Sequence, residues 1–146
     1  MTKQPHAHIS LVTLGVADVE RAAAFYEKLG FARKMRKSDG VAFFEAGPIA
    51  LSLYGKDALA ADAGLDAEKT AGFRAASLAW NCPDEATVDA VLDLAAKSGG
   101  TVLKKGHRIF WGGYVGFFSD PDGHLWEAAH NPHFPLSPDG RLTLPD

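Results

Sequence analysis

The apolar residues near the start of the chain first alternate with smaller or polar residues and then take up helical spacing. Val12, Leu14 and Val16 share one side of a predicted strand, which leaves its other side less apolar. Asp18 has the side chain of a helix N-cap, and apolar residues recur at helical intervals after it until a glycine ends the pattern. Short apolar runs separated by glycine turns then predict three more strands. Residues 1–54 are therefore predicted to form a β-α-β-β-β module.

The same order of patterns returns in the second half of the chain. Residues 55–72 are small and mixed in character, so they are predicted to be a linker with one or two helical turns. A strand, a helix opened by Pro83 and Asp84, and three further strands are predicted over residues 73–130. Such an internal repeat indicates two copies of one module. We predict an α+β fold of two β-α-β-β-β modules, each a curved mixed sheet with its helix on the outside, so that the two remaining sheet faces together make a cavity.

The last segment, residues 131–146, contains four prolines and cannot form a regular helix. It is predicted to be extended. Its apolar residues favour a strap that lies over the chain's own domain or over a partner subunit; they are Phe134, Leu136, Leu142 and Leu144.

The composition narrows the class of protein. The chain has 146 residues and a net charge of -3, and its Lys and Arg residues do not gather into an extended basic patch, so no nucleic-acid partner is expected. Cys82 is the single cysteine, which excludes an intrachain disulfide and favours a small buried side chain. Because the sequence has no apolar run near the length of a membrane span and no hydrophobic leader at its start, we expect a cytoplasmic protein with no membrane partner.

The strongest local signal for function is a predicted hairpin near the end of the second module. Two aromatic-rich strands flank the turn sequence 120–123, Asp-Pro-Asp-Gly. Glu127 lies inside the second strand, between Trp126 and Ala128. An ionised carboxylate in that setting is costly unless a cation, a proton or hydrogen-bond donors meet it. Glu127 is therefore predicted to face either a functional cavity or a wet edge of the sheet.

The paired modules, the helix sequence over 18–31 and the hairpin sequence over 120–127 resemble the vicinal oxygen chelate superfamily. This superfamily contains glyoxalase I, extradiol dioxygenases, fosfomycin-resistance transferases and bleomycin-resistance proteins. The resemblance covers nearly the whole chain apart from the linker and the C-terminal segment. It implies the glyoxalase/bleomycin-resistance-like fold, a small-molecule ligand and a homodimer.

The resemblance also implies where a metal would bind. Metal-dependent members hold a divalent ion with His, Gln or Glu side chains, and the matching positions here are Leu11, Leu51, Ser77 and Glu127. Only Glu127 is a usual ligand, since leucine cannot bind a cation and a serine hydroxyl is a poor partner for these metals. We therefore expect no cofactor. A divalent metal held by Glu127 and completed by His107 or by the substrate stays an alternative.

The role of Glu127 is open from the sequence. It could be a structural carboxylate satisfied by water, Thr13, Ser77 or a tyrosine hydroxyl, or be neutralised by Arg74 or Arg108. Alternatively, desolvation raises its pKa and makes it a proton acceptor or an anchor for a ligand. The candidate ligand-binding residues around it are Leu11, Thr13, Phe43, Leu51, Ser77, His107, Trp111 and Tyr114.

Two functional hypotheses follow. The first is a small-molecule-binding protein of the bleomycin-resistance type, which holds an apolar or aromatic ligand without a metal. The second is a glyoxalase-type lyase or isomerase, or a dioxygenase, that uses Glu127 as a general base or as part of a non-standard metal site. A scaffold subunit with a filled interior between its modules is the third possibility.

Overall fold

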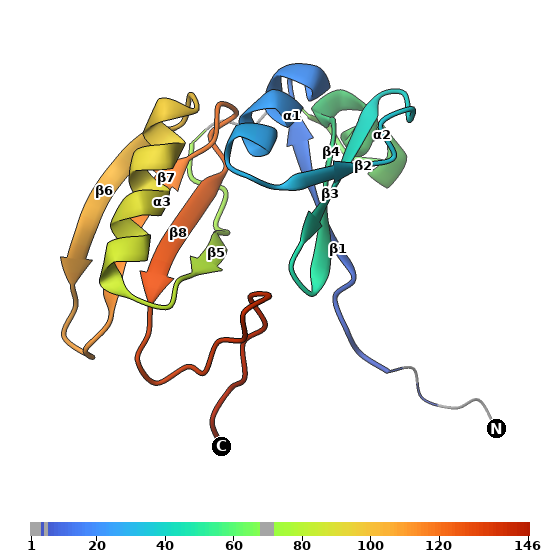
Figure 1. Cartoon of the computed structure of the whole chain (residues 1–146). Helices are drawn as coiled ribbons and strands as arrows, with labels where there is room; N and C mark the ends of the chain where they lie inside the picture. Colours follow the sequence, from blue (N-terminus) through green and yellow to red (C-terminus); the bar gives the residue numbers. More distant parts are fainter. Residues whose placement is uncertain (1–3, 5, 68–71) are drawn as a thin grey trace.

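The first module is a four-stranded mixed sheet with one helix. The computed structural model describes residues 4, 6–67 and 72–146. In the first sheet, sheet A, the strand order is β1-β4-β3-β2, with β1 parallel to β4 and the other pairs antiparallel. Its elements are β1 (Leu11–Val16), α1 (Val19–Lys28), β2 (Ala32–Lys34), β3 (Val41–Ala46) and β4 (Ile49–Gly55) (Figure 1).

The second module repeats this topology. Its sheet, sheet B, has the order β5-β8-β7-β6, again with one parallel pair, β5 and β8. Its elements are β5 (Leu78–Asn81), α3 (Glu85–Lys97), β6 (Thr101–Arg108), β7 (Tyr114–Ser119) and β8 (Leu125–His130). The predicted fold of two β-α-β-β-β modules is confirmed. The segment between the modules contains the short helix α2 (Lys56–Ala63).

Both module helices begin where the sequence predicts. The side chain of Asp18 accepts a hydrogen bond from the backbone N–H of Arg21, and the side chain of Asp84 accepts one from Thr87. The second module is predicted to begin with a strand at residue 73. The observed strand, β5, begins only at Leu78, where its pairing with β8 begins.

Each sheet has a helix-bearing face and an open face. In sheet A, Val12 pairs with Leu51 and Leu14 with Leu53, and these side chains belong to the buried cluster under the helix or pack against it. The residues between them point the other way, because side chains alternate along a strand. We call that side the open face of sheet A; it carries Leu11, Thr13, Phe43, Ala50 and Ser52.

The two modules meet through helix α1. Tyr26 on α1 is fully buried; its hydroxyl donates to Asp120 at 2.7 Å and accepts from the indole N–H of Trp126 at 3.1 Å. The ring of Phe31 lies 5.5 Å from that of Trp80 and 5.8 Å from that of Trp126. One buried cluster thus joins the modules, and Figure 1 shows α1 between the two sheets. The prediction that each helix lies on the outside is wrong for α1.

Gly116 allows helix α3 to lie close to β7. A Cβ atom at this position would stand 2.4 Å from Cδ1 of Leu92 and 3.0 Å from the carbonyl oxygen of Lys104. We expect Gly116→Ala to lower the free energy of unfolding by about 1–3 kcal/mol, measured by urea denaturation. Gly55→Ala is the control, since its new Cβ would meet only Ala58, at 4.0 Å. Equal effects of the two changes would contradict this packing.

The C-terminal segment crosses from sheet B toward sheet A. Leu136 and Leu142 form an isolated antiparallel bridge. The carbonyl oxygen of Asp139 lies 2.9 Å from where a Cβ of Gly47 would stand, so this segment reaches the turn between β3 and β4. Among the described residues, no helix is long and apolar enough to cross a membrane.

Candidate functional site

Glu127 lies on the open face of sheet B. It pairs with Ala79 on β5 and with Phe117 on β7, and it is half-buried. The neighbouring residues Trp126 and Ala128 point to the opposite face and join the buried cluster. Burial raises the pKa of Glu127 above its ordinary value, as the desolvation argument predicts. The described residues give its carboxylate no hydrogen-bond or ion-pair partner.

The protein groups proposed as partners of Glu127 bond elsewhere. Thr13 shares a 2.6 Å hydrogen bond with Ser52, and Arg108 pairs with Glu85 at 3.3 Å. Arg74 contacts the His124 ring and the carbonyl oxygen of Asp122. The three tyrosine hydroxyls each donate to an aspartate: Tyr26 to Asp120, Tyr54 to Asp62 and Tyr114 to Asp89. Within the described chain, Glu127 is thus a desolvated carboxylate facing open space.

The four positions implied for a metal do not share one site. Leu11 pairs with Ala50, whereas Leu51 pairs with Val12, so Leu51 lies on the helix-bearing face and is 2% exposed. The expectation that Leu51 shares a face with Leu11 is wrong, because Leu11 pairs with the residue before Leu51, and neighbouring residues of a strand point to opposite faces. Ser77 precedes β5 and is exposed.

The available donors do not fit a metal centre. In the described part of the chain, no group of three or more His, Cys, Asp or Glu side chains is placed to hold a metal ion. Catalytic zinc needs three protein ligands, and the open face of sheet A supplies apolar side chains, two hydroxyl groups and one carboxylate, Glu45, which is paired with Lys34. No chemical step through a metal is derived from this site.

The open face of sheet A is largely apolar with one polar pair. Leu11 is 43% exposed, and Phe43 is half-buried opposite Ser52. The Thr13–Ser52 hydroxyl pair lies beside this aromatic ring. Thr13, Phe43 and Leu11 therefore do share one face, as a ligand-contact surface requires.

Two predicted contributors from the second module, His107 and Tyr114, lie on opposite faces of sheet B. His107 pairs with Val115 and thus lies on the same face as Glu127, with its Nδ1 2.9 Å from the carbonyl oxygen of Lys105. Tyr114 lies on the other face, where its hydroxyl donates to Asp89 of α3 at 2.8 Å. Its predicted place in the Glu127 wall is wrong, since Tyr114 and Phe117 are three positions apart on β7 and so point to opposite faces.

Trp111 lies in the loop between β6 and β7 and is 39% exposed. Its ring covers Gly113, where an added Cβ would stand 2.1 Å from the indole. The indole therefore packs on its own loop.

A cavity of about 950 Å³ lies between the modules. Residues of both sheet faces line it: Phe31, Leu51, Trp80 and Trp126 come from the helix-bearing faces, and Glu45, Ala50, Ser77 and Ala79 come from the open faces. Glu127 is not among its lining residues. Glu127 thus lies outside this cavity, whereas the sequence analysis expected it to face a cavity between the modules.

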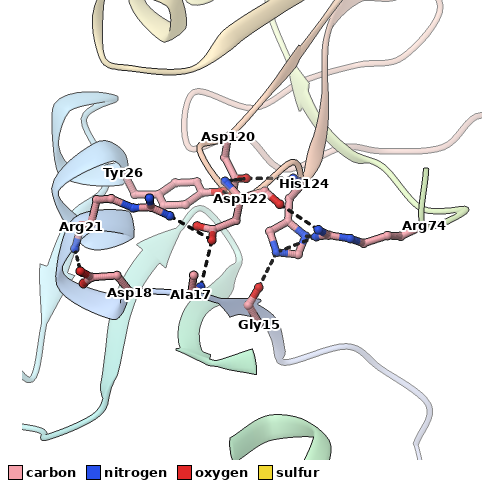
Figure 2. A network of polar contacts seen from close by, with 9 residues as sticks. All are labelled: Gly15, Ala17, Asp18, Arg21, Tyr26, Arg74, Asp120, Asp122 and His124. Carbon is pink, nitrogen blue, oxygen red and sulfur yellow. Dashed lines mark hydrogen bonds and ion pairs between the residues drawn. The ribbon is translucent and has the colours of Figure 1, made fainter. Parts of the chain in front are cut away.

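The sequence predicts only a hairpin turn at residues 120–123. In the structure this turn belongs to a polar network that joins the modules (Figure 2). Asp122 accepts from the backbone N–H of Ala17 at 2.9 Å and pairs with Arg21 at 3.2 Å. The Nε2 atom of His124 donates to the carbonyl oxygen of Gly15 at 2.7 Å. The Asp-Pro-Asp-Gly sequence indicates a turn, but only the fold shows that this turn contacts the end of β1.

The architecture and the open sheet faces define the class of protein: a paired-module protein with the fold of the glyoxalases and their relatives. The sequence model of the Glyoxalase/Bleomycin resistance protein/Dioxygenase superfamily matches residues 7–128, and the chain belongs to this superfamily. The predicted membership in the vicinal oxygen chelate superfamily is confirmed. No curated protein matches the sequence significantly.

Solved structures support the same conclusion. A glyoxalase-related enzyme from Fulvimarina pelagi is 31% identical, with a TM-score of 0.84 over 94% of this chain and 97% of that one. A family enzyme from Burkholderia phytofirmans is 19% identical, with a TM-score of 0.76 over 85% and 98%. A lactoylglutathione lyase from Agrobacterium tumefaciens is 22% identical, with a TM-score of 0.66 over 88% and 96%. The last two likenesses show the fold alone.

Proposed function

We propose that the protein binds an apolar or aromatic small molecule on the open face of sheet B, with Glu127 as the polar anchor and without a protein-held metal. The observation that carries this proposal is the half-buried Glu127 carboxylate, which has no partner among the described residues and faces away from the core. Phe117 and Leu125 flank it on that face and supply apolar contact area. An apolar surface with one convergent polar group is typical of small-molecule sites.

We further propose that a second copy of the chain completes this site. Sheet A carries an exposed Leu11, a half-buried Phe43 and the Thr13–Ser52 pair on its own open face. Within one chain the modules meet through α1, so sheet A does not cover Glu127. A homodimer in which sheet A of the partner faces sheet B would bury both apolar faces and enclose the ligand.

One observation favours a catalytic alternative. The raised pKa of Glu127 is the direction that a general base needs, because proton transfer is most effective when the pKa approaches the working pH. A glyoxalase-type lyase or isomerase, or a dioxygenase, would use that carboxylate to accept a proton from a bound substrate. For such an enzyme, Glu127→Gln would reduce turnover by orders of magnitude, whereas a binding protein would change only its ligand preference.

Burial of Glu127 predicts a dependence of stability on pH. Its pKa in the folded chain lies above the ordinary value of 4.5, so the folded state holds this proton more tightly than the unfolded state. Stability from this group is fully present below pH 4.5 and is lost as the pH rises through the folded-state pKa. We expect Glu127→Gln to raise the melting temperature at pH 7 and to have little effect at pH 4.

The control for this melting experiment is Asp93→Asn, which changes an exposed carboxylate on α3. We expect no comparable gain from it. A Glu127→Gln protein that melts at a lower temperature than the wild type at pH 7 would show that the carboxylate has a stabilising partner.

The proposed function is tested by a thermal-shift screen of apolar and aromatic small molecules, followed by calorimetric titration of those that stabilise the protein. We expect ligands whose affinity changes by about tenfold in Glu127→Gln and not in Asp93→Asn, since loss of a hydrogen bond to a charged group has roughly that effect. Ligands that bind both variants as they bind the wild type would contradict the role of Glu127.

A further inference from the structure

The cavity between the modules does not have Glu127 among its lining residues, and it has the walls of a small-molecule site. Its volume of about 950 Å³ lies within the range of ligand pockets. Its apolar lining comes from both modules and from the C-terminal segment, and includes Phe31, Leu51, Leu78, Trp80, Trp126 and Leu136. We call it the inter-module cleft.

Aromatic rings in fixed positions form one wall of the inter-module cleft. Phe31 packs against Trp80 at 5.5 Å, with the ring planes 63° apart, and against Trp126 at 5.8 Å. Trp126 uses its N–H inside the core, where it donates to Tyr26, and so presents carbon atoms to the cleft. Phe31 and Trp80 are only half-buried. This wall suits a flat apolar group, which would bury the aromatic surface that the chain leaves open.

The charged groups of the cleft have one sign. Its described lining contains the carboxylates of Glu45 and Asp139 and no Lys, Arg or His side chain. Asp139 accepts a hydrogen bond from the Ser137 hydroxyl, and this bond, with a smaller contribution from the nearby Arg141 guanidinium outside the lining, holds the pKa of Asp139 below its ordinary value. Glu45 is exposed and lies 3.7 Å from the ammonium group of Lys34. Carboxylates beside aromatic rings attract a cation and disfavour an anion.

The C-terminal segment forms the remaining wall. Residues 136–140 line the cleft, and the backbone N–H of Arg141 donates to the Ser137 hydroxyl at 2.8 Å. Figure 1 shows this segment turning between sheet B and the lower end of sheet A. Asp139 is thereby placed opposite the aromatic wall that the two modules supply.

We propose that the inter-module cleft is a second binding site and takes a hydrophobic amine, with its apolar ring against Phe31 and Trp80 and its ammonium group near Asp139. This site needs no dimer and no contribution from Glu127. It is therefore independent of the function proposed above.

Three probes of one size test the charge preference. They are 1-naphthylmethylamine, which is cationic at pH 7, the neutral 1-naphthalenemethanol and the anionic 1-naphthoic acid, each titrated into the full chain by calorimetry. We expect the amine to bind about threefold more tightly than the alcohol, which corresponds to an ion pair near the surface, and the acid to bind least. Equal affinities for the three probes, or no binding of the amine, would overturn the proposal.

Two variants locate the probe. Trp80→Ala is expected to weaken the amine and the alcohol by about tenfold or more, because it removes an aromatic anchor. Asp139→Asn changes an exposed side chain, so the fold is retained, and it is expected to remove only the advantage of the amine over the alcohol. The controls are Phe110→Ala, which removes a fully exposed ring elsewhere, and Asp57→Asn on α2. Both controls should leave the affinities unchanged.

Two results would show that the amine binds elsewhere or that the cleft has another occupant. Loss of amine binding in Glu127→Gln, with Trp80→Ala unaffected, would place the amine on the open face of sheet B. A dimer that dissociates in Trp80→Ala, measured by analytical ultracentrifugation, would show that a second copy covers the cleft. Either result would overturn the proposal.

Discussion

Replacing Tyr26 with alanine is expected to lower the free energy of unfolding by about 3–5 kcal/mol, the cost of emptying a large buried aromatic site. Tyr26 is 0% exposed and packs against rings from both modules, including Phe44 on sheet A and Trp126 on sheet B. The change also removes the hydroxyl that donates to Asp120 and accepts from Trp126. Because α1 joins the modules, both should lose structure in one transition, measured by urea denaturation followed by circular dichroism.

Tyr54→Ala is the matched control, since the Tyr54 hydroxyl also donates to an aspartate but its ring lies outside the buried cluster. We expect that change to cost much less. Similar losses in the two variants, or a Tyr26→Ala protein that keeps one module folded, would contradict a joint core.

Asp120→Ala is expected to be the second most damaging change, at roughly 3 kcal/mol or more, because it leaves several donors without an acceptor. The Asp120 side chain is nearly buried and accepts from the Tyr26 hydroxyl and from the backbone N–H groups of Asp122 and His124. Burial raises the pKa of Tyr26, so its phenol stays protonated and continues to donate. Loss of Asp120 therefore affects the hairpin turn and the module contact together.

The control for Asp120→Ala is Asp93→Ala, an exposed aspartate on α3. Its effect should stay within about 0.5 kcal/mol, as is usual for a surface substitution. Thermal unfolding of the two variants checks the comparison, and equal melting temperatures would show that the Asp120 contacts do not hold the modules together.

Local patterns predicted most of the fold. The order of the elements, both helix caps and the repeat itself follow from alternation, capping side chains and turn residues, which act over a few positions. The face of Leu51 could not be predicted in the same way, because it depends on the register between β1 and β4. That register is a contact between residues far apart in the chain.

The arrangement of the two modules also could not be predicted from the sequence. An amphipathic helix shows which of its sides is buried, but not whether a second sheet lies beyond it. The Tyr26 ring reaches sheet B only because the turn after β7 docks on the first module through Asp122 and His124. This docking turns the two open sheet faces away from the shared core.

The candidate site was predicted in part. The raised pKa of Glu127 follows from its apolar sequence neighbours and is confirmed in direction. The arginines, Thr13 and the tyrosine hydroxyls were wrong as partners of this carboxylate, because they bond to other groups in the fold, such as Ser52 for Thr13 or Glu85 for Arg108. Side-chain pairing of this kind depends on distances that no periodicity contains.

Native mass spectrometry of protein purified without a chelator tests the central claim, that a carboxylate and two apolar sheet faces bind an organic molecule across two chains. We predict a species of twice the chain mass that carries no stoichiometric transition metal and that retains or takes up an organic ligand. A species with one transition-metal ion per chain, lost in the Glu127→Gln variant, would contradict the account and assign the site to a metalloenzyme.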